Sequence, residues 1–244
     1  MEEDKLEDRR FGGVARLYGK DTYERFRRAT VVVVGLGGVG SWAAEALARS
    51  AIGHLVLIDF DHVSESNTNR QLHAIEGEFG KAKVEVMAAR LLKINPLIKL
   101  TCFDEFLEAE NLKRLIPLDA FVLDASDSVK AKIALAAWCA AHSQALVMCG
   151  AAGGKFNPTL VCCDDLSKTE QDALLAKVRA GLRADFGFSR DLKKKMGIRA
   201  VYSREPRSGK ATGGLACSGY GSTVMVTANS GFIAAAEILN LIAS

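Results

Sequence analysis

Several signatures that would assign a function class directly are missing from this sequence of 244 residues. None of its six cysteines forms a C-x-x-C pair, so the usual zinc knuckle is absent and we expect no zinc. No Walker motif occurs, which excludes a P-loop enzyme. The opening residues MEEDKLEDRR are charged throughout and do not form a secretory signal. We therefore expect reduced thiols and a cytoplasmic protein.

Internal repeats and low-complexity linkers are absent as well. The most apolar stretch, 220–243, is long enough to suggest a membrane span, but it contains Asn229, Glu237, Asn240 and many small residues. We expect a packed helix there and no membrane association.

The stretch 30–59 carries the strongest pattern that is present. Val31–Val34 form a continuous apolar run, which is typical of a parallel strand buried on both faces. An alanine-rich helix and a second apolar strand ending at Asp59 follow a G-x-G-x-x-G turn made by Gly35, Gly37 and Gly40. Glycines let a phosphate approach a helix start closely, and an acid at the next strand end suits ribose hydroxyls. The unit therefore predicts a nucleotide site.

Strands and helices alternate along the rest of the first 149 residues. We expect helices near 81–94, 108–115 and 129–142, and strands at 99–103, 120–123 and 146–149. This alternation predicts an α/β, Rossmann-like fold, a mostly parallel sheet with helices on both faces. Residues 1–150 would form the nucleotide-binding core, including an N-terminal arm, 1–29, with a turn at Gly12-Gly13.

Residues 151–244 are expected to form a smaller C-terminal αβ extension of one continuous domain, with a strand at 159–163, a helix at 169–184 and the C-terminal helix. Between 177 and 210, eleven Lys/Arg and three acids give a charge of +8, which leaves −5 for the rest of a chain whose total is +3. Such asymmetry indicates a polyanionic partner, with a solvated basic face as the alternative. The glycine-rich stretch 203–219 is expected to be a mobile loop.

The long polar connection after Asp59 carries the groups that point to chemistry. Asn67, Asn69, Arg70 and Gln71 share one loop, and Lys81 and Lys83 begin the next helix. The glycine unit with Asp59 also suits NAD, so a nicotinamide-dependent oxidoreductase is one alternative. Positive groups at this density favour a triphosphate whose pyrophosphate leaves. Asp127, at a strand end across the cleft, is suited to Mg²⁺. The set predicts attack of a carboxylate on the α-phosphate of ATP.

These segments together resemble the ThiF/MoeB/HesA superfamily of ubiquitin-activating-type adenylating enzymes. The resemblance is carried by FGGVARLYG, GLGGVGSWAAEALARSAIG, IDFDHVSESNTNRQLHA, GKAKVEVM, INP, VLDASDSVKAK and TGGLACSGYGSTVMVTA. Within the superfamily the sequence is similar to the tRNA threonylcarbamoyladenosine dehydratases. That subfamily activates the threonyl carboxylate of threonylcarbamoyladenosine at tRNA position 37 with ATP and closes it to an oxazolone.

The resemblance implies a role for each matching position. Asp59 would bind the ribose, Asn69 and Arg70 the phosphates, Lys83 the triphosphate, and Asp127 magnesium. Arg16 would reach the ATP site of the neighbouring subunit in a homodimer, although a solvated helix arginine is the plainer interpretation. The expected nucleotide site comprises Gly35, Gly37, Gly38, Gly40, Asp59, Asp61, Asn67, Asn69, Arg70, Gln71 and Lys83. The expected tRNA contacts are Lys193, Lys194, Lys195 and Arg199.

Several alternatives stay open. Activation of the C-terminal glycine of a ubiquitin-like sulfur-carrier protein is the main rival, and the missing C-x-x-C pairs, common in such activators, weaken it. Cys217 is either a transfer nucleophile or a packing or loop residue. Carbonyls of glycine-rich loops can hold a monovalent cation, which the sequence leaves undecided. The subfamily also implies a cysteine-desulfurase system as partner, through no particular residue.

Overall fold

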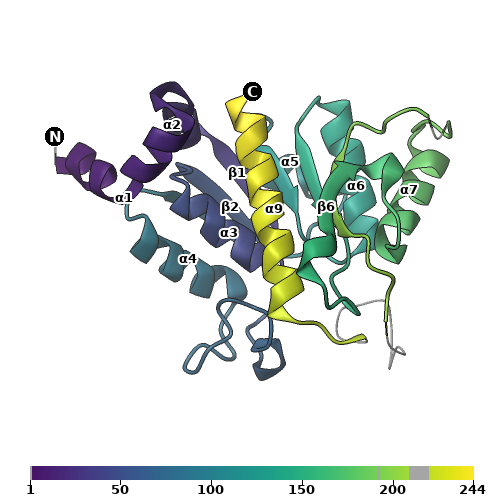
Figure 1. Ribbon diagram of the computed structural model, residues 1–244, viewed down its shortest axis with the longest axis horizontal. Helices are drawn as coiled ribbons and strands as arrows, with labels where there is room; N and C mark the ends of the chain where they lie inside the picture. The colour runs from purple at the N-terminus through teal and green to yellow at the C-terminus, as the bar shows by residue number, and fades with distance from the viewer. Residues whose placement is uncertain (1, 192, 209–219) are drawn as a thin grey trace.

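A seven-stranded sheet runs through the middle of the molecule in the computed structural model, which describes residues 2–191, 193–208 and 220–244 (Figure 1). The strand order is β3-β2-β1-β4-β5-β7-β6. The strands are β1 Thr30–Val34, β2 His54–Ile58, β3 Lys99–Phe103, β4 Phe121–Asp124, β5 Leu146–Cys149, β6 Val161–Asp165 and β7 Arg199–Ser203. Only β6, at the edge, runs antiparallel to its neighbour. The Rossmann-like, mostly parallel sheet is thus confirmed.

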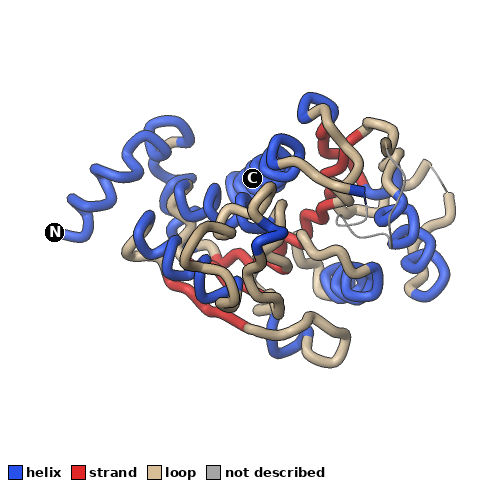
Figure 2. The backbone as a smooth tube through the Cα atoms, turned by 90° about the horizontal axis from the view of Figure 1, so that it is seen from below, coloured by secondary structure: helices blue, strands red, loops and turns tan. Residues whose placement is uncertain are grey.

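Helices cover both faces of this sheet, as the view onto its edge shows (Figure 2). They are α1 Glu2–Tyr18, α2 Lys20–Arg28, α3 Gly40–Arg49, α4 Lys83–Ile94, α5 Leu112–Leu115, α6 Val129–Ala141, α7 Ala173–Asp185 and α9 Val224–Ala243. Short 3-10 turns lie at η1 Glu65–Asn67, η2 Pro158–Leu160 and η3 Leu166–Lys168.

The four valines of β1 explain how one strand binds the two layers together. Val31 and Val33 pack with α3, α4 and α9 on one face. Val32 and Val34 pack with α5, α6 and α7 on the other. All four are at most 2% exposed. Because successive side chains of a strand point to opposite faces, a continuous apolar run is what a strand between two helical layers requires.

The turn expected at Gly12-Gly13 is wrong, because α1 continues through both glycines. Phe11, which is 4% exposed, packs with Tyr23 and Ala51 and anchors the helix at this point. That tertiary contact offsets the roughly 1 kcal/mol by which each glycine disfavours a helix. The N-terminal part of α1 extends away from the body of the molecule (Figure 2).

The C-terminal part of the chain extends the same sheet. β7 pairs in parallel with β5, and α9 then crosses the face formed by β4, β5, β6 and β7 (Figure 1). By length and mean hydropathy, 1.4, α9 could span a membrane, but 56% of its most apolar window is buried inside the protein. Ala234, Ala235 and Ile238 lie against the sheet with at most 1% exposure. The apolar stretch is therefore a packed core helix.

Candidate active site

A cavity of about 600 Å³ opens at the carboxyl edge of the parallel strands, the lower edge in Figure 1. Its walls come from the glycine turn after β1, the long loop after β2, the loop after β4 and the exit of β5 at Gly150–Ala152. Ligand sites in open α/β sheets lie at this edge, where strand ends leave backbone groups and loop side chains free. The volume is that of a typical small-molecule site.

The glycine turn is built so tightly that side chains are excluded from it. Gly35 has φ +84, and a Cβ there would lie 2.9 Å from the Ser126 nitrogen. A Cβ on Gly40 would lie 1.8 Å from the Gly35 carbonyl oxygen, so α3 begins directly on the turn. This close approach brings the positive end of α3 to the cavity floor, where an anion is stabilised.

Asp59 fixes the turn from the end of β2. Its carboxylate accepts hydrogen bonds from the backbone nitrogens of Leu36 and, at 2.8 Å, Asp61. Burial raises the pKa of Asp59, and the charge of Lys83 and these two hydrogen bonds act in the opposite direction. A carboxylate has about four lone-pair positions, so two backbone donors leave room for ribose hydroxyls.

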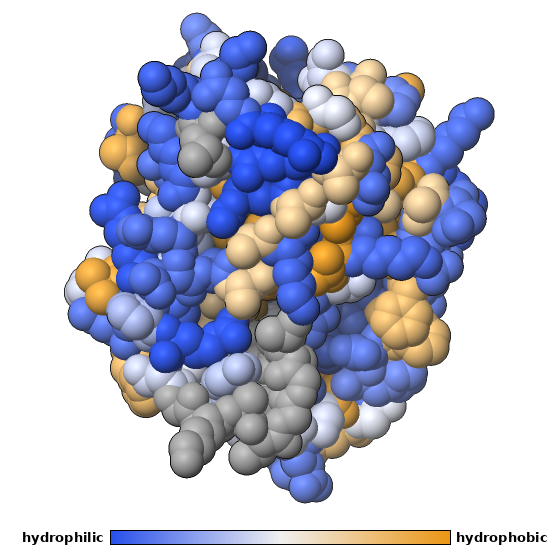
Figure 3. Space-filling model, turned by 90° about the vertical axis from the view of Figure 1, so that its right-hand side faces the viewer, coloured by the Kyte–Doolittle hydropathy of each residue, from blue (hydrophilic) through white to orange (hydrophobic). Residues whose placement is uncertain are grey.

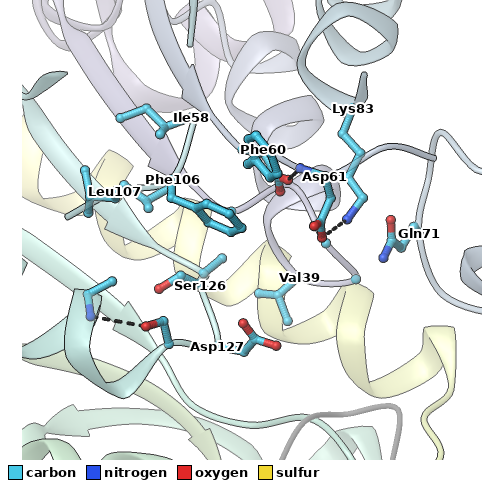
Figure 4. A pocket seen from close by; sticks show the side chains of 18 of the residues that line it. Val39, Ile58, Phe60, Asp61, Gln71, Lys83, Phe106, Leu107, Ser126 and Asp127 are labelled. Atoms are coloured by element: carbon cyan, nitrogen blue, oxygen red, sulfur yellow. Dashed lines mark hydrogen bonds and ion pairs between the residues drawn. The ribbon is translucent and has the colours of Figure 1, made fainter. Parts of the chain in front are cut away.

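Lys83 lies beside Asp59 at the start of α4. It is 4% exposed, and its Nζ lies 2.8 Å from Oδ2 of Asp61 (Figure 4). A backbone hydrogen bond from Lys83 N to Asp61 O, 3.0 Å long, joins the same two residues. These two contacts close the base of the loop between Asp61 and Lys83. The buried Lys83 ammonium thus lines the cavity while it is paired with the Asp61 carboxylate.

The loop closed in this way presents the predicted polar cluster. Arg70 lines the cavity, and its Nη1 donates to Ser66 O at 2.8 Å and to Asn69 Oδ1 at 2.9 Å. Asn67, 9% exposed, accepts a hydrogen bond from Ser64 N at 3.1 Å and so holds the turn η1. Gln71 is 7% exposed, and its buried Oε1 has no partner among the described residues. The side chain lines the cavity, and its Nε2 lies beside the glycine turn, 4.0 Å from where a Cβ on Gly37 would be.

Asp127 faces this cationic side from across the cavity (Figure 4). Its carboxylate is exposed and makes no hydrogen bond or ion pair within the described part of the chain. Beneath the loop that carries it, Asp124 and Lys132 form a fully buried ion pair, with Lys132 Nζ 3.2 Å from Asp124 Oδ1. The same Oδ1 accepts hydrogen bonds from Ser126 N and Ser126 Oγ and so holds the loop in place. A free carboxylate beside a phosphate site fits Mg²⁺, which binds through one or two carboxylates plus phosphate oxygens.

The sequence reasoning missed the aromatic wall of this cavity. Phe60 and Phe106 stack with ring centroids 4.4 Å apart, and they are 47% and 61% exposed. Both line the cavity, from the loops that follow β2 and β3 (Figure 4). The signal available was a phenylalanine directly after Asp59, at the start of a loop that is rich in polar residues. Exposed flat rings of this kind suit a purine base.

Comparisons with known proteins agree with this geometry. The model of the ThiF family matches residues 11–244. The chain belongs to the ThiF family. The tRNA threonylcarbamoyladenosine dehydratase of Escherichia coli (strain K12) is 44% identical over 246 residues, which cover 94% of this chain and 92% of that protein.

Two solved structures of this family extend the match to three dimensions. One named TcdA (CsdL) is 44% identical, has a TM-score of 0.91, and covers 98% of this chain and 95% of that one. The Escherichia coli TcdA in complex with ATP is 45% identical with a TM-score of 0.89, and covers 96% and 94% of the two chains. A nucleotide complex is thus established for a ThiF-family relative of nearly the same fold.

Not every predicted residue of this ThiF-family chain lies at the cavity. Ten do: Gly35, Gly37, Gly38, Asp59, Asp61, Asn67, Arg70, Gln71, Lys83 and Asp127. Gly40 lies behind the turn, and Asn69 donates to Ser222 O at 2.8 Å instead. Arg16 is exposed on α1 and does not line the cavity. Cys217 lies outside the described residues.

The predicted tRNA contacts lie farther away. Lys193, Lys194 and Lys195 are exposed and precede β7, whose amino end is at the edge of the sheet opposite the cavity. Arg199, the first residue of β7, forms an ion pair with Glu237 of α9. The protein side that carries α7 is largely hydrophilic, with an apolar strip across it (Figure 3).

Much of the positive charge counted in 177–210 serves internal contacts. Arg179 donates to the Thr169 hydroxyl, and Arg183 donates to Ser189 O at 3.1 Å. Arg204 lies 3.8 Å from a carboxylate oxygen of Glu170, and Arg207 lies over the Tyr220 ring. The charge free to meet a polyanion is therefore smaller than the sequence count of +8 indicates.

Proposed function

We propose that this chain is an ATP-dependent tRNA-modifying enzyme that acts on threonylcarbamoyladenosine at tRNA position 37. It would adenylate the threonyl carboxylate and promote dehydration to the cyclic oxazolone. The observation that carries the proposal is the placement of Arg70 and Lys83 opposite the unpaired Asp127 around a cavity floored by the glycine turn. The likeness to threonylcarbamoyladenosine dehydratases over nearly the whole chain supports the choice of substrate.

In the proposed reaction, the glycine turn and Asp59 hold the phosphates and ribose, and the Phe60–Phe106 pair offers a face to the adenine. A carboxylate oxygen of the substrate attacks the α-phosphorus, and pyrophosphate leaves toward Arg70 and Lys83, which offset its charge. The tethered carbamoyl oxygen then attacks the activated carboxyl carbon, AMP departs, and a carbamoyl N–H proton is lost. Because the attacking group is already tethered, its effective concentration is high and no protein nucleophile is needed.

Magnesium is part of the proposal through Asp127. Its unpaired carboxylate at the cavity would hold the ion together with phosphate oxygens. The ion would neutralise triphosphate charge, which the cations Arg70 and Lys83 only partly offset. Lys83 is paired with Asp61 in the free protein, so the incoming triphosphate must share or take over that lysine.

The test is to incubate the protein with ATP, Mg²⁺ and tRNA that carries threonylcarbamoyladenosine, and to measure the mass of the nucleoside. We expect loss of one water per modified nucleoside, dependent on ATP. An unchanged mass would refute the proposed function. The sulfur-carrier alternative predicts instead that pyrophosphate exchange depends on a ubiquitin-like protein. Measuring ATP–pyrophosphate exchange once with the modified tRNA and once with such a carrier protein therefore separates the two functions.

We further propose that the enzyme acts as a homodimer in which Arg16 enters the partner subunit's site. Arg16 is exposed on the projecting helix α1 and does not line its own cavity, and the adjoining Leu17 is 78% exposed. An arginine supplied in this way can be worth roughly 10³–10⁵ in rate. Mixed dimers of Arg16→Ala and Arg70→Ala subunits should regain activity that each variant lacks. Inactive mixed dimers, once shown to form, would exclude a role across the interface.

The remaining expectations concern context. We propose that the tRNA is held in part by Lys193, Lys194, Lys195 and Arg199, and that residues 1–150 act as the adenylation core with 151–244 as its substrate-binding extension. A tRNA substrate favours the cytoplasm as location. Contact with a cysteine-desulfurase system stays a prediction from the family resemblance.

A further inference from the structure

Lys155 is buried in a position that the proposed chemistry does not use. It lies in the loop after β5 and is 2% exposed. Its Nζ donates to the carbonyl oxygens of Gln171 at 3.0 Å, of Ser203 at 3.4 Å and of Glu205. An ammonium group has three N–H donors and no acceptor. Three carbonyls therefore satisfy it completely, with no side chain taking part.

The carbonyl oxygens of Gln171, Ser203 and Glu205 form a carbonyl cage around the Lys155 ammonium, and the charges nearby also suit a cation. Burial lowers the pKa of Lys155, while the carboxylates of Asp172 and Glu205 act in the opposite direction and Arg207 adds to the lowering. Neither carboxylate contacts the ammonium group directly, because each accepts hydrogen bonds from backbone nitrogens. Asp172 accepts from Ala151 N and Leu175 N, and Glu205 accepts from Phe156 N and Asn157 N. The direct contacts of the cation are thus carbonyl dipoles, the ligands that coordinate K⁺ in proteins.

One of these carbonyls is held in place by a strained residue. Gln171 has φ +54, a left-handed conformation that costs a residue with a side chain free energy. It directly precedes Asp172, the N-cap of α7. A cation that binds the Gln171 carbonyl stabilises this conformation and therefore the start of α7.

The same loop joins the cavity to the C-terminal part of the chain. Gly150–Ala152, at its beginning, line the cavity. Gly154 donates to Gly221 O and accepts from Ser208 N, both at 2.9 Å. A Cβ on Gly154 would lie 2.8 Å from Ser208 O, so this junction requires glycine. Whatever fills the carbonyl cage fixes the cavity wall relative to Ser208 and Gly221.

We propose that the Lys155 ammonium is a built-in replacement for a bound monovalent cation, and that removing it converts the carbonyl cage into a K⁺ site. Lys155 is then a positioning residue that holds this loop in place without a monovalent cation in the cage. This inference does not depend on the proposed function, since it concerns the fold of the loop and is tested without substrate.

The experiment compares melting temperatures in KCl and in choline chloride at equal ionic strength. The difference between the two salts for the wild-type protein is the baseline. Lys155→Ala, which opens the cage, should melt about 6 °C lower or more in choline chloride and recover much of this loss with KCl, saturably. Lys155→Met is the matched control. It loses the charge but fills the space, so KCl should not restore it.

Equal melting of Lys155→Ala in both salts would overturn the proposal, as would a recovery of Lys155→Met with KCl as large as that of Lys155→Ala. If Lys155→Ala does not fold, Lys155→Gln carries the test. Its shorter amide leaves room for an ion and adds an oxygen ligand, so its melting temperature must rise with KCl and not with choline chloride. No rise for this variant would likewise refute the replacement.

Discussion

The cavity-forming region 30–149 and the basic region 177–208 differ in how their sequences relate to what they do. In the first, a backbone pattern with fixed spacing, the glycine turn ending at Gly40, produces one tight geometry. In the second, a high count of Lys/Arg is divided between internal contacts, such as Arg199 with Glu237, and exposed residues such as Lys193. Spacing dictates local geometry, whereas a charge count does not say which charges are free.

The largest effect on activity should come from substituting the charged residues of the first region that lie at the cavity. Arg70→Ala and Asp127→Asn should each lower the rate of ATP-dependent pyrophosphate exchange by roughly 10²–10³-fold. Arg70 offsets phosphate charge directly, and Asp127 would hold the Mg²⁺ that does the same. Both residues lie on polar loops, so circular dichroism should stay unchanged. Lys177→Ala, an exposed change on α7, is the control and should keep full activity. Global unfolding of either site variant would identify it as structural.

A stability test addresses the glycine turn itself. Gly40→Ala should lower the free energy of unfolding by about 3 kcal/mol or more, since its Cβ would overlap the Gly35 carbonyl oxygen at 1.8 Å. Gly37→Ala is the matched control, because its Cβ would meet only Gln71 Nε2, at 4.0 Å. Its stability should change by about 1 kcal/mol or less while ATP binding weakens. Urea unfolding measures both, and similar losses would contradict the role of the turn.

His73 gives the first region a pH dependence. It is 1% exposed, neither ring nitrogen has a partner among the described residues, and burial, followed by Lys83 and Arg90, lowers its pKa from 6.5 to about 4. The folded state thus binds fewer protons than the unfolded state between these values. Stability should be full above pH 6.5 and fall by on the order of 3 kcal/mol as the pH drops to about 4. His73→Leu should flatten this fall in urea titrations across pH, and an unchanged slope would exclude His73 as its source.

The smallest effect is expected in the basic region. Reversal of Lys193, Lys194 and Lys195 to Glu should weaken tRNA binding about tenfold at low salt, and reduce the salt slope by about 1 per lysine that contacts a phosphate. ATP binding should not change, because these lysines precede β7 at the edge away from the cavity. Affinity that is unchanged across a salt titration would remove these residues from the tRNA surface.

The sequence predicted the fold well where short-range periodicity decides it. The strands at 99–103 and 146–149 were expected within their observed bounds, and β1 followed from its four valines. β7 was not predicted, because its short apolar run lies between basic loops and becomes a strand only by pairing with β5. The Asp124–Lys132 ion pair and the Phe60–Phe106 stack each join residues from different secondary-structure elements or loops. A local sequence pattern therefore does not predict either contact.

The two hydrogen bonds of Gly154 have a consequence for how this protein can vary. They fix Ser208 and Gly221 on the same residue, so the intervening chain starts and ends at one anchored point. In general, doubling the length of a loop raises the entropic cost of closing it by only about 0.6 kcal/mol. Insertions between these two residues should therefore be inexpensive and leave the ATP cavity unaltered.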